Sequence, residues 1–379
     1  MSELTWVEIS ESSLKNNIRQ LRTIIGRNTL LCPCVKANAY GHGLVPTAKT
    51  FIDAGADWLS VNAVYEAQAL RDAGITAPVY ILGYVPLDSI APAVDLNCRL
   101  VVYNMETLKA ISAAAKKNGA AAKVHLKVET GTNRQGIPAT DLNEFAAVAN
   151  TLDNIVLEGL ATHFANIEDT TDHSYAEHQL DRFQQAAAAL KSAGLEIPLL
   201  HCANSAATIL FQKTLFHMVR PGIACYGMWP SRETRDAYAR EIKNGFKLSP
   251  ALTWKTKIAQ IKPVPAGGCI GYGCTFRTER PTTLAIIPVG YYDGYDRSLR
   301  RGHVLIRGRR APVLGRICMN IIMADITDIP GAALEDEVVL IGSAGREAVT
   351  AEDLAAWAGT INYEITTRIN ERIPRIPVE

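Results

Sequence analysis

Short apolar runs rich in β-branched residues alternate with amphipathic segments over the first two thirds of the chain. The runs predict eight strands, at residues 29–37, 58–63, 78–83, 99–104, 122–129, 156–164, 198–205 and 218–227. Between them, segments such as 64–74, 105–119 and 175–194 repeat apolar residues at helical spacing. Eight strands separated by helices predict an α/β fold, an N-terminal (β/α)8 TIM barrel. An open doubly wound sheet is the alternative, but the sequence contains no GxGxxG turn.

The pattern changes after about residue 241. Strands joined by turns are predicted there, at 251–264, 282–289, 302–308, 311–327 and 336–343, followed by a short helix at 350–360 and a basic tail. We therefore expect two domains. The barrel covers residues 1–241, with its first few residues as candidates for pairing with the second domain, and a mainly-β domain covers residues 242–379.

Composition excludes several classes of partner. A net charge of +1 gives no electrostatic basis for binding nucleic acid or an anionic membrane. The sequence shows no signal peptide and no apolar run long enough to span a membrane, so a cytoplasmic location is expected. The eight cysteines form no CxxC pair. Reduced, mostly buried thiols are therefore expected instead of disulfides or a zinc site.

Polar residues collect where the predicted barrel strands end, which is where barrel enzymes place their active sites. In chain order these residues are Lys36, Lys127, Glu129, Arg134, His163, His201, Asn204, Ser205 and Arg220, and Arg220 is followed by Pro221, Gly222 and Ile223. A lysine in a partly desolvated barrel mouth can act as an amine nucleophile and form a Schiff base. A salt bridge at the rim is the alternative for Lys36, and its position alone does not decide between them.

The segment VKANAYGHG around Lys36 resembles the cofactor-lysine motif of alanine racemases. Further matches follow in the family's order: TGTNRQG (130–136), ATHFA (161–165), HCANSAA (201–207), VRPGIACYG (219–227), GYGCTF (271–276), PVGYYDGYDR (288–297), GRICMN (315–320) and INYEI (361–365). The resemblance spans the whole chain. It implies an enzyme that uses pyridoxal 5′-phosphate (PLP) to interconvert L- and D-alanine, supplying D-alanine for peptidoglycan.

The resemblance also implies roles for single residues. Lys36 would hold PLP and serve as the acid/base group on one face of the substrate Cα, and Tyr272 of the partner subunit in a homodimer would serve the other face. PLP would be bound by Lys36, Tyr40, His163, Asn204, Ser205, Arg220, Gly222, Ile223 and Tyr363. The residue types fit a phosphate, which needs backbone N–H groups and hydroxyls. For Ser205 alone, a helix N-cap is the simpler explanation.

Arg220 is placed by the resemblance against the pyridine nitrogen of PLP. Because an arginine keeps its proton, the ring nitrogen should stay unprotonated, which discourages transamination. His201 and His163 would hydrogen-bond this arginine and its neighbours. Taken alone, each histidine is better explained as a satisfied buried imidazole, and Tyr272 as an aromatic residue in a glycine-rich turn.

The substrate carboxylate would be bound by Arg134 and by the backbone N–H of Met319. Lys127 would be carbamylated and would orient Arg134; a plain ion pair between Lys127 and Glu129 is the alternative. The resemblance assigns Tyr291, Arg297 and Arg316 to an entry corridor, for which a solvated surface is the alternative.

Several positions depart from the family's usual residues: Thr132, Asn133, Asn166, Glu168, Tyr292 and Asn320. They bear on substrate breadth more than on reaction type, so a racemase of broader specificity, for serine or basic amino acids, is the first alternative. A decarboxylase of the same fold is disfavoured by Arg220, because those enzymes pair the ring nitrogen with an acid. A PLP-binding protein without turnover is disfavoured by the full second domain with Tyr272.

Overall fold

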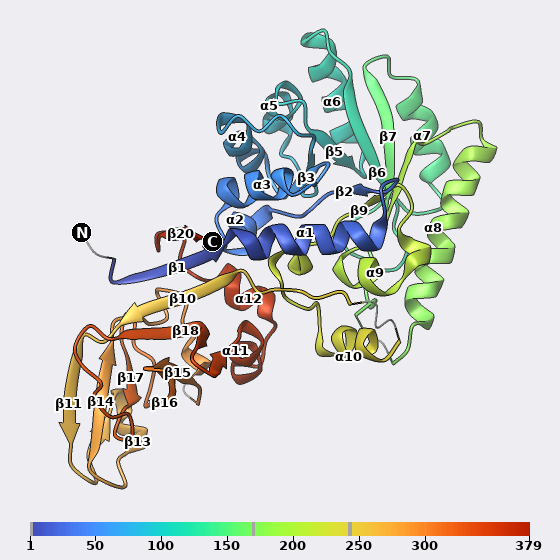
Figure 1. Cartoon of the computed structure of the whole chain (residues 1–379). Coiled ribbons are helices and arrows are strands. Elements are labelled where there is room, and N and C mark those ends of the chain that lie inside the picture. The colour runs from blue at the N-terminus through green and yellow to red at the C-terminus, as the bar shows by residue number, and fades with distance from the viewer. Residues whose placement is uncertain (1–2, 169–170, 242–244, 300) are drawn as a thin grey trace. The chain divides into compact units, whose positions relative to one another are not determined.

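The computed structural model describes residues 3–168, 171–241, 245–299 and 301–379 (Figure 1). The chain divides into two compact units. One consists of Ser12–Ala39 and Leu44–Pro250, and the other of Met1–Glu11, Tyr40–Gly43 and Ala251–Glu379. The predicted junction between residues 241 and 242 borders a segment outside the described residues.

The first unit is built on parallel strands. They are β2 (Leu30–Leu31), β3 (Leu59–Val61), β4 (Val79–Ile81), β5 (Arg99–Val102), β6 (Ala122–Lys127), β7 (Ile155–Ala161), β8 (Leu199–His201) and β9 (Met218–Val219). Strands β3 to β8 form one sheet in chain order, and β2 pairs with β9. A bridge between Cys34 and Ser60 links β2 to β3, and the N–H of Arg220 donates to the carbonyl of Ala203 at 2.9 Å beside β8 and β9. The ring is closed, so the predicted barrel is confirmed.

Helices surround these strands (Figure 1). They are α1 (Glu11–Ile25), α3 (Leu44–Asp53), α4 (Val64–Asp72), α5 (Ile90–Asp95), α6 (Met105–Lys117), α7 (Leu142–Asn150), α8 (Ser174–Ser192), α9 (Ser205–Leu210) and α10 (Arg232–Glu241). Helix α6 illustrates why they form. Asn104 caps its N-terminus by accepting the N–H of Thr107 at 2.8 Å, and Leu108, Ile111 and Ala115 bury one face.

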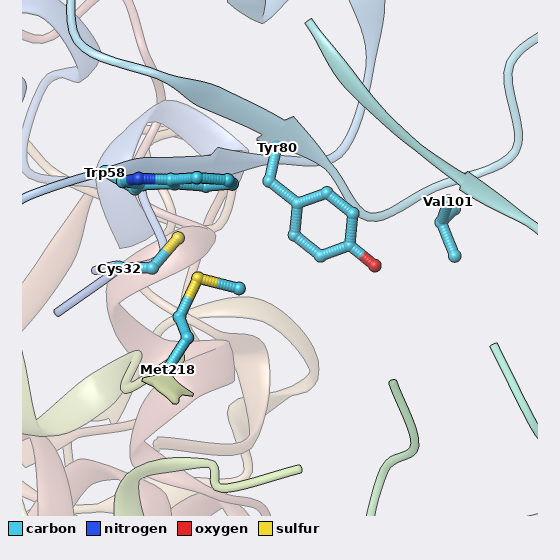
Figure 2. Close-up of a cluster of buried hydrophobic side chains, with 5 residues drawn as sticks. All are labelled: Cys32, Trp58, Tyr80, Val101 and Met218. Atoms are coloured by element: carbon cyan, nitrogen blue, oxygen red, sulfur yellow. The ribbon is translucent and has the colours of Figure 1, made fainter. Parts of the chain in front are cut away.

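A cluster of buried hydrophobic side chains packs among the barrel strands (Figure 2). The cluster drawn there consists of Cys32, Trp58, Tyr80, Val101 and Met218. Burial raises the pKa of the Cys32 thiol to about 12, so this cysteine is chemically quiet. The expectation of reduced, mostly buried thiols is confirmed, with two exceptions in the second unit. Cys32, Cys34, Cys98, Cys202 and Cys225 are buried and Cys318 is half-buried, whereas Cys269 and Cys274 are exposed.

The second unit is a mainly-β structure. Its main sheet has the order β11-β14-β17-β16-β15-β18-β10-β1-β20, with β19 paired to β18, and β12 and β13 form a separate hairpin. The strands are β1 (Thr5–Ser10), β10 (Leu252–Lys257), β11 (Gln260–Val264), β12 (Cys269–Ile270), β13 (Phe276–Arg277), β14 (Thr282–Ile287), β15 (His303–Ile306), β16 (Arg309–Leu314), β17 (Ile322–Asp325), β18 (Glu337–Ala344), β19 (Glu347–Val349) and β20 (Arg375–Val378). The segment predicted as a basic tail is therefore strand β20, which pairs with β1.

Two helices complete the second unit, α11 (Ala351–Ala358) and α12 (Asn362–Thr367). Helix α11 confirms the helix predicted at 350–360. The Thr350 side chain accepts the N–H of Asp353, and the Asp353 side chain accepts the N–H of Thr350, which together form a capping box. Helix α12 was not predicted. No helix in the described parts of the chain is both long enough and apolar enough to cross a membrane.

Candidate active site

Lys36 begins a turn of left-handed backbone. The element α2 (Lys36–Tyr40) contains Ala37, Asn38 and Ala39 at φ 54°, 53° and 52°, and Tyr40 follows at φ 53°. Residues with a Cβ pay roughly 1–2 kcal/mol each for this conformation. Strain of this kind persists only where the surroundings hold it, and it concentrates at functional sites.

Glu66, a buried residue of α4, holds this turn. Its Oε1 accepts the N–H of Ala37 at 2.7 Å, and its Oε2 accepts those of Asn62 at 2.7 Å and Ala63 at 3.1 Å. One carboxylate therefore ties the residue after Lys36 to the end of the neighbouring strand β3. Glu66 was not among the predicted site residues.

Positive charges gather around His163, which follows β7. Burial lowers the pKa of His163, and charged neighbours contribute to a value of about 3. In order of effect these neighbours are Arg220, Arg134, Lys127 and Lys36. The barrel thus brings predicted site residues from several strand ends into one electrostatic neighbourhood. An excess of positive charge there suits a ligand with a phosphate or a carboxylate.

Within the part of the chain that the structure describes, Lys127 forms no ion pair with Glu129, the simpler explanation considered for it. Burial and nearby cations lower its pKa to about 8, and its Nζ donates to Oε1 of Gln135 at 3.2 Å. The Glu129 carboxyl accepts the backbone N–H groups of Gly131 at 2.6 Å and Arg134 at 3.3 Å. Burial acts to raise the pKa of this carboxyl, but the backbone donors outweigh it and lower the pKa. Glu129 therefore shapes the loop that carries Arg134.

Arg220 is fixed by two of its guanidinium nitrogens. Nη1 donates to Nδ1 of His201, and Nη2 donates to the carbonyl of Thr162 at 2.9 Å. Among the described residues, Nε of Arg220 has no hydrogen-bond acceptor. His201 in turn lies 2.7 Å from His125 (Nε2 to Nδ1), and Nε2 of His125 lies 3.1 Å from Oε2 of Glu158. The structure thus places the predicted His201 on Arg220 and adds two residues behind it.

Asn204, not Ser205, is the N-cap of α9. Its Oδ1 accepts the N–H of Ala207 at 3.0 Å, which corrects the simpler explanation offered for Ser205. The Nδ2 of Asn204 donates to Oε1 of Glu168 at 3.0 Å. Burial raises the pKa of that carboxyl. The amide of Asn204 is therefore engaged in holding the loop after β8 against the segment after β7.

Ser205 lies against the turn that follows β9. Its Oγ accepts the N–H of Gly222 at 2.9 Å and that of Ala224 at 3.3 Å. These bonds use the oxygen lone pairs, so the hydroxyl hydrogen of Ser205 is available to a ligand. Two backbone N–H groups, those of Gly222 and Ile223, were predicted to bind phosphate. The N–H of Gly222 donates to Ser205 instead. Ile223 begins the 3-10 helix η3 (Ile223–Tyr226).

The second unit carries the remaining predicted residues. Tyr272 begins the 3-10 turn η4 (Tyr272–Cys274) between β12 and β13, and its side chain is 69% exposed. Gly271 and Gly273 flank it at φ 70° and 72°. Arg316 packs on this turn, because a Cβ on Gly273 would lie 3.1 Å from its Nη1. Glycines on both sides let the backbone present Tyr272 outward.

Two loops of this unit bring Tyr291 and Met319 together. The N–H of Tyr291 donates to the carbonyl of Cys318 at 3.1 Å, and the N–H of Tyr292 donates to the carbonyl of Met319 at 2.9 Å. Gly290 is required at this crossing, since a Cβ there would lie 2.2 Å from the carbonyl oxygen of Cys318. Tyr291, Tyr292 and Met319 are all exposed. Arg297, the other predicted corridor residue, lies in η5 (Arg297–Leu299) and is also exposed.

Tyr40 and Tyr363, far apart in the sequence, lie close together in the second unit. Their ring centroids are 6.0 Å apart. Gly41, next to Tyr40, passes so close to α12 that a Cβ would lie 2.0 Å from the carbonyl oxygen of Thr366. The structure therefore joins two predicted phosphate-binding hydroxyl residues through a helix that the sequence pattern did not indicate.

Two departures from the family pattern have a structural account. Asn133 stands at φ 52°, a left-handed conformation that asparagine tolerates where glycine is usual. Asn320 donates from Nδ2 to Oδ2 of Asp293 at 3.1 Å. An aspartate at position 320 would instead place a second carboxylate beside Asp293.

Family models cover both units of the chain. The model described as "Alanine racemase, N-terminal domain" matches residues 9–230, and "Alanine racemase, C-terminal domain" matches residues 251–377. The chain belongs to the alanine racemase family. The family resemblance and the prediction of an amino-acid racemase enzyme are confirmed.

Relatives named alanine racemase match nearly the whole chain. The protein from Halothermothrix orenii is 43% identical over 372 residues, covering 98% of this chain and 96% of the relative. The one from Desulfovibrio desulfuricans is 41% identical over 375 residues, covering 99% and 98%. The crystal structure of alanine racemase from Bacillus anthracis with bound L-Ala-P has a TM-score of 0.93 at 37% identity, covering 100% of this chain and 96% of that one. Alanine racemase from Streptomyces lavendulae also has a TM-score of 0.93, at 35% identity, covering 100% and 98%.

Glu66, His125 and Glu158 were not predicted as site residues of this alanine racemase family member. Each left a signal in the sequence. Glu158 interrupts an apolar strand run, His125 shares a strand face with Lys127, and Glu66 is the third residue of a helix that directly follows a strand. None of these sequence features shows which residue each side chain contacts, because the contacted residues lie on other segments of the chain.

Proposed function

We propose that the protein interconverts L- and D-alanine with PLP as cofactor and Lys36 and Tyr272 as the two acid/base groups. The observation that carries the proposal is the group of cations around His163, with Lys36 held among them at the end of a barrel strand. A family whose named relatives match the whole chain supports the reaction.

The residues at the strand ends fit PLP. Ser205 offers its hydroxyl hydrogen to the phosphate, and we propose Ile223, Tyr40 and Tyr363 as further phosphate donors. Gly222 and Asn204 support this cradle through the hydrogen bonds they already make. Bound to an amino acid, PLP withdraws electrons from Cα and makes its proton acidic.

Arg220 is proposed to face the ring nitrogen of PLP with its Nε–H, the donor that its partners leave unused. A guanidinium does not release its proton, so it would keep the ring nitrogen unprotonated. A weaker electron sink favours return of the proton to Cα over transamination. His163, whose low pKa keeps it neutral, would contact the ring without adding charge.

Arg134 and the backbone N–H of Met319 are proposed to bind the substrate carboxylate. We further propose that Lys127 is carbamylated. Its lowered pKa of about 8 leaves a substantial fraction of neutral amine near neutral pH, and that amine can add to CO₂ with loss of a proton. The resulting anion would orient Arg134.

A homodimer with a shared active site is proposed from exposed hydrophobic side chains in the loops of the second unit. These are Tyr272, Tyr291, Tyr292, Met319 and Ile321, each at least 42% exposed. Exposed patches of this kind mark association sites. Tyr272, Tyr291, Arg316 and Met319 would then act on the partner's barrel. We also propose a cytoplasmic location and a role in supplying D-alanine for peptidoglycan.

The activity is tested by chiral chromatography of amino acids incubated with the PLP-loaded protein. Alanine should give the highest kcat/KM, with serine turned over slowly, because an apolar pocket rejects an added hydroxyl by only about 100-fold. Faster turnover of lysine or arginine than of alanine would favour the broad-specificity alternative. No racemisation of any amino acid would reject the proposal.

Shared sites are tested with Lys36→Ala and Tyr272→Phe, each inactive alone. A mixed dimer would have one site with both defects and one with neither, so refolding the two variants together should restore about a quarter of wild-type activity. Activity no higher than that of the separately refolded variants, despite demonstrated subunit exchange, would place both groups in one chain.

A further inference from the structure

A chain of hydrogen bonds leads from Arg220 through the barrel interior to Glu158 on β7. It passes through His201 on β8 and His125 on β6, both completely buried. The two internal links are short, 2.7 Å between the imidazoles and 3.1 Å from His125 to the carboxylate. Three separate strands therefore supply groups that stand in line behind the arginine.

The positions of the protons along this chain follow from its two ends. Arg220 can only donate, so Nδ1 of His201 must be the acceptor, and a neutral His201 then carries its proton on Nε2. That proton faces Nδ1 of His125, which must accept it and therefore carries its own proton on Nε2. Nε2 of His125 donates to Glu158, which as a carboxylate only accepts. Every link points from Arg220 toward Glu158.

The carboxylate end of the chain is kept charged. Nε of Arg99 lies 3.2 Å from Oε2 of Glu158, and Nζ of Lys123 lies 3.2 Å from Oε1 of the same carboxylate. Burial acts to raise the pKa of Glu158, but His125, Arg99 and Lys123 together lower it. Burial lowers the pKa of both histidines, which stay neutral between the two charged ends.

We infer that Glu158 is a positioning residue for Arg220, acting through His125 and His201. If His125 placed its proton on Nδ1, His201 would have to accept on Nε2 and would turn an N–H toward the guanidinium. The N–H groups of His201 and Arg220 would then face each other, and the guanidinium would move away from His201. A hydrogen bond to a charged acceptor favours the productive tautomer of His125 by about 10- to 100-fold. The inference deepens the proposed function, because it concerns the arginine that faces the cofactor ring.

The tautomers can be measured without any reaction. In protein labelled with ¹⁵N-histidine, long-range ¹H–¹⁵N correlation distinguishes Nε2–H from Nδ1–H imidazoles, and His→Gln variants assign the two signals. We expect His125 and His201 to be neutral and protonated on Nε2 from pH 6 to 8. An Nδ1–H tautomer or an imidazolium at either position in the wild-type protein overturns the inference.

The role of the carboxylate is tested with Glu158→Gln, whose amide can present either N–H or C=O to His125. The expected result is loss of the single tautomer at His125, a fall in the kcat of racemisation of about tenfold or more, and little change in KM. The matched control is Lys123→Met, which removes the partner of Oε1 and leaves the His125 link intact; it should keep the wild-type tautomers. A Glu158→Gln protein with wild-type tautomers and kcat overturns the inference.

The two proposals fail separately. Wild-type protein with the expected tautomers but no racemisation would reject the proposed function and leave the hydrogen-bond chain standing. Active protein with different tautomers would do the reverse. If Glu158→Gln does not fold, the tautomers of the wild-type protein still test the inference. Only hydrogen bonds that all donate in the direction from Arg220 to Glu158 are compatible with a guanidinium at one end and a carboxylate at the other.

Discussion

Replacing Glu66 by glutamine should loosen the turn that carries Lys36. The carboxylate accepts three backbone N–H groups, one on Oε1 from Ala37 and two on Oε2 from Asn62 and Ala63. A glutamine has only one oxygen to offer. The glutamine oxygen can accept two of the three hydrogen bonds if it faces the N–H groups of Asn62 and Ala63. The side-chain NH₂ group then faces the N–H of Ala37, so that two donors oppose each other.

The turn contains four non-glycine residues in left-handed backbone, a strain on the order of 4–8 kcal/mol in total. Losing the charged acceptor of Ala37 and opposing two donors should cost about 2–4 kcal/mol. At 1.36 kcal/mol for each factor of ten, local opening should become roughly 30- to 1000-fold more frequent.

Hydrogen exchange read by mass spectrometry measures this opening directly. Peptides covering residues 36–44 should exchange faster in Glu66→Gln, while those from β6 and β7 stay protected. Asp57→Asn is the matched control, because Asp57 also accepts a backbone N–H, that of Leu31 at 2.7 Å. It should affect Leu31 and leave 36–44 unchanged. Equal exchange at 36–44 in Glu66→Gln and wild type would refute the idea that Glu66 holds the turn.

Three further results are expected. Borohydride reduction of the PLP-loaded protein should leave the pyridoxyl group on the peptide with Lys36, and label on Lys127 instead would reject the assignment. Arg220→Glu should raise pyruvate formation from alanine relative to racemisation, because a carboxyl group can share a proton with the ring nitrogen; an unchanged ratio would contradict this role. Burial lowers the pKa of His163 to about 3 in the folded protein, and it also lowers the pKa values of His125 and His201. Since the unfolded state then binds more protons below about pH 6.5, the urea midpoint should fall between pH 8 and pH 5, and a constant midpoint would count against these buried neutral histidines.

The barrel was predictable because its strands are buried on both faces and appear as separate apolar runs. Strand β20 was not, because RIPV contains a proline and its residues are mostly exposed, so only pairing with β1 defines it. Helix α12 is six residues long, too short to show a period in the sequence. Its role is visible only in the approach of Gly41 to Thr366.

The candidate site was predictable where one residue identifies its own chemistry. Lys36 and Arg220 stand at strand ends, and the resemblance of their motifs to the family's motifs selected them. Glu158 and His125 act only as a pair, and they meet because β6 and β7 lie side by side. The capping role given to Ser205 was off by one residue, since either Asn204 or Ser205 is a good N-cap and only the backbone angles separate them.

The left-handed turn after Lys36 has a stereochemical consequence. The steric rule that penalises it applies to L-residues and is reversed for their mirror images. Alanine occupies positions 37 and 39, so the residue that best suits this backbone is D-alanine, which a ribosome does not insert. A semisynthetic chain with D-alanine at both positions should keep Lys36 in place even when Glu66 is replaced by glutamine. The chain made of L-residues instead depends on a carboxylate from the neighbouring helix.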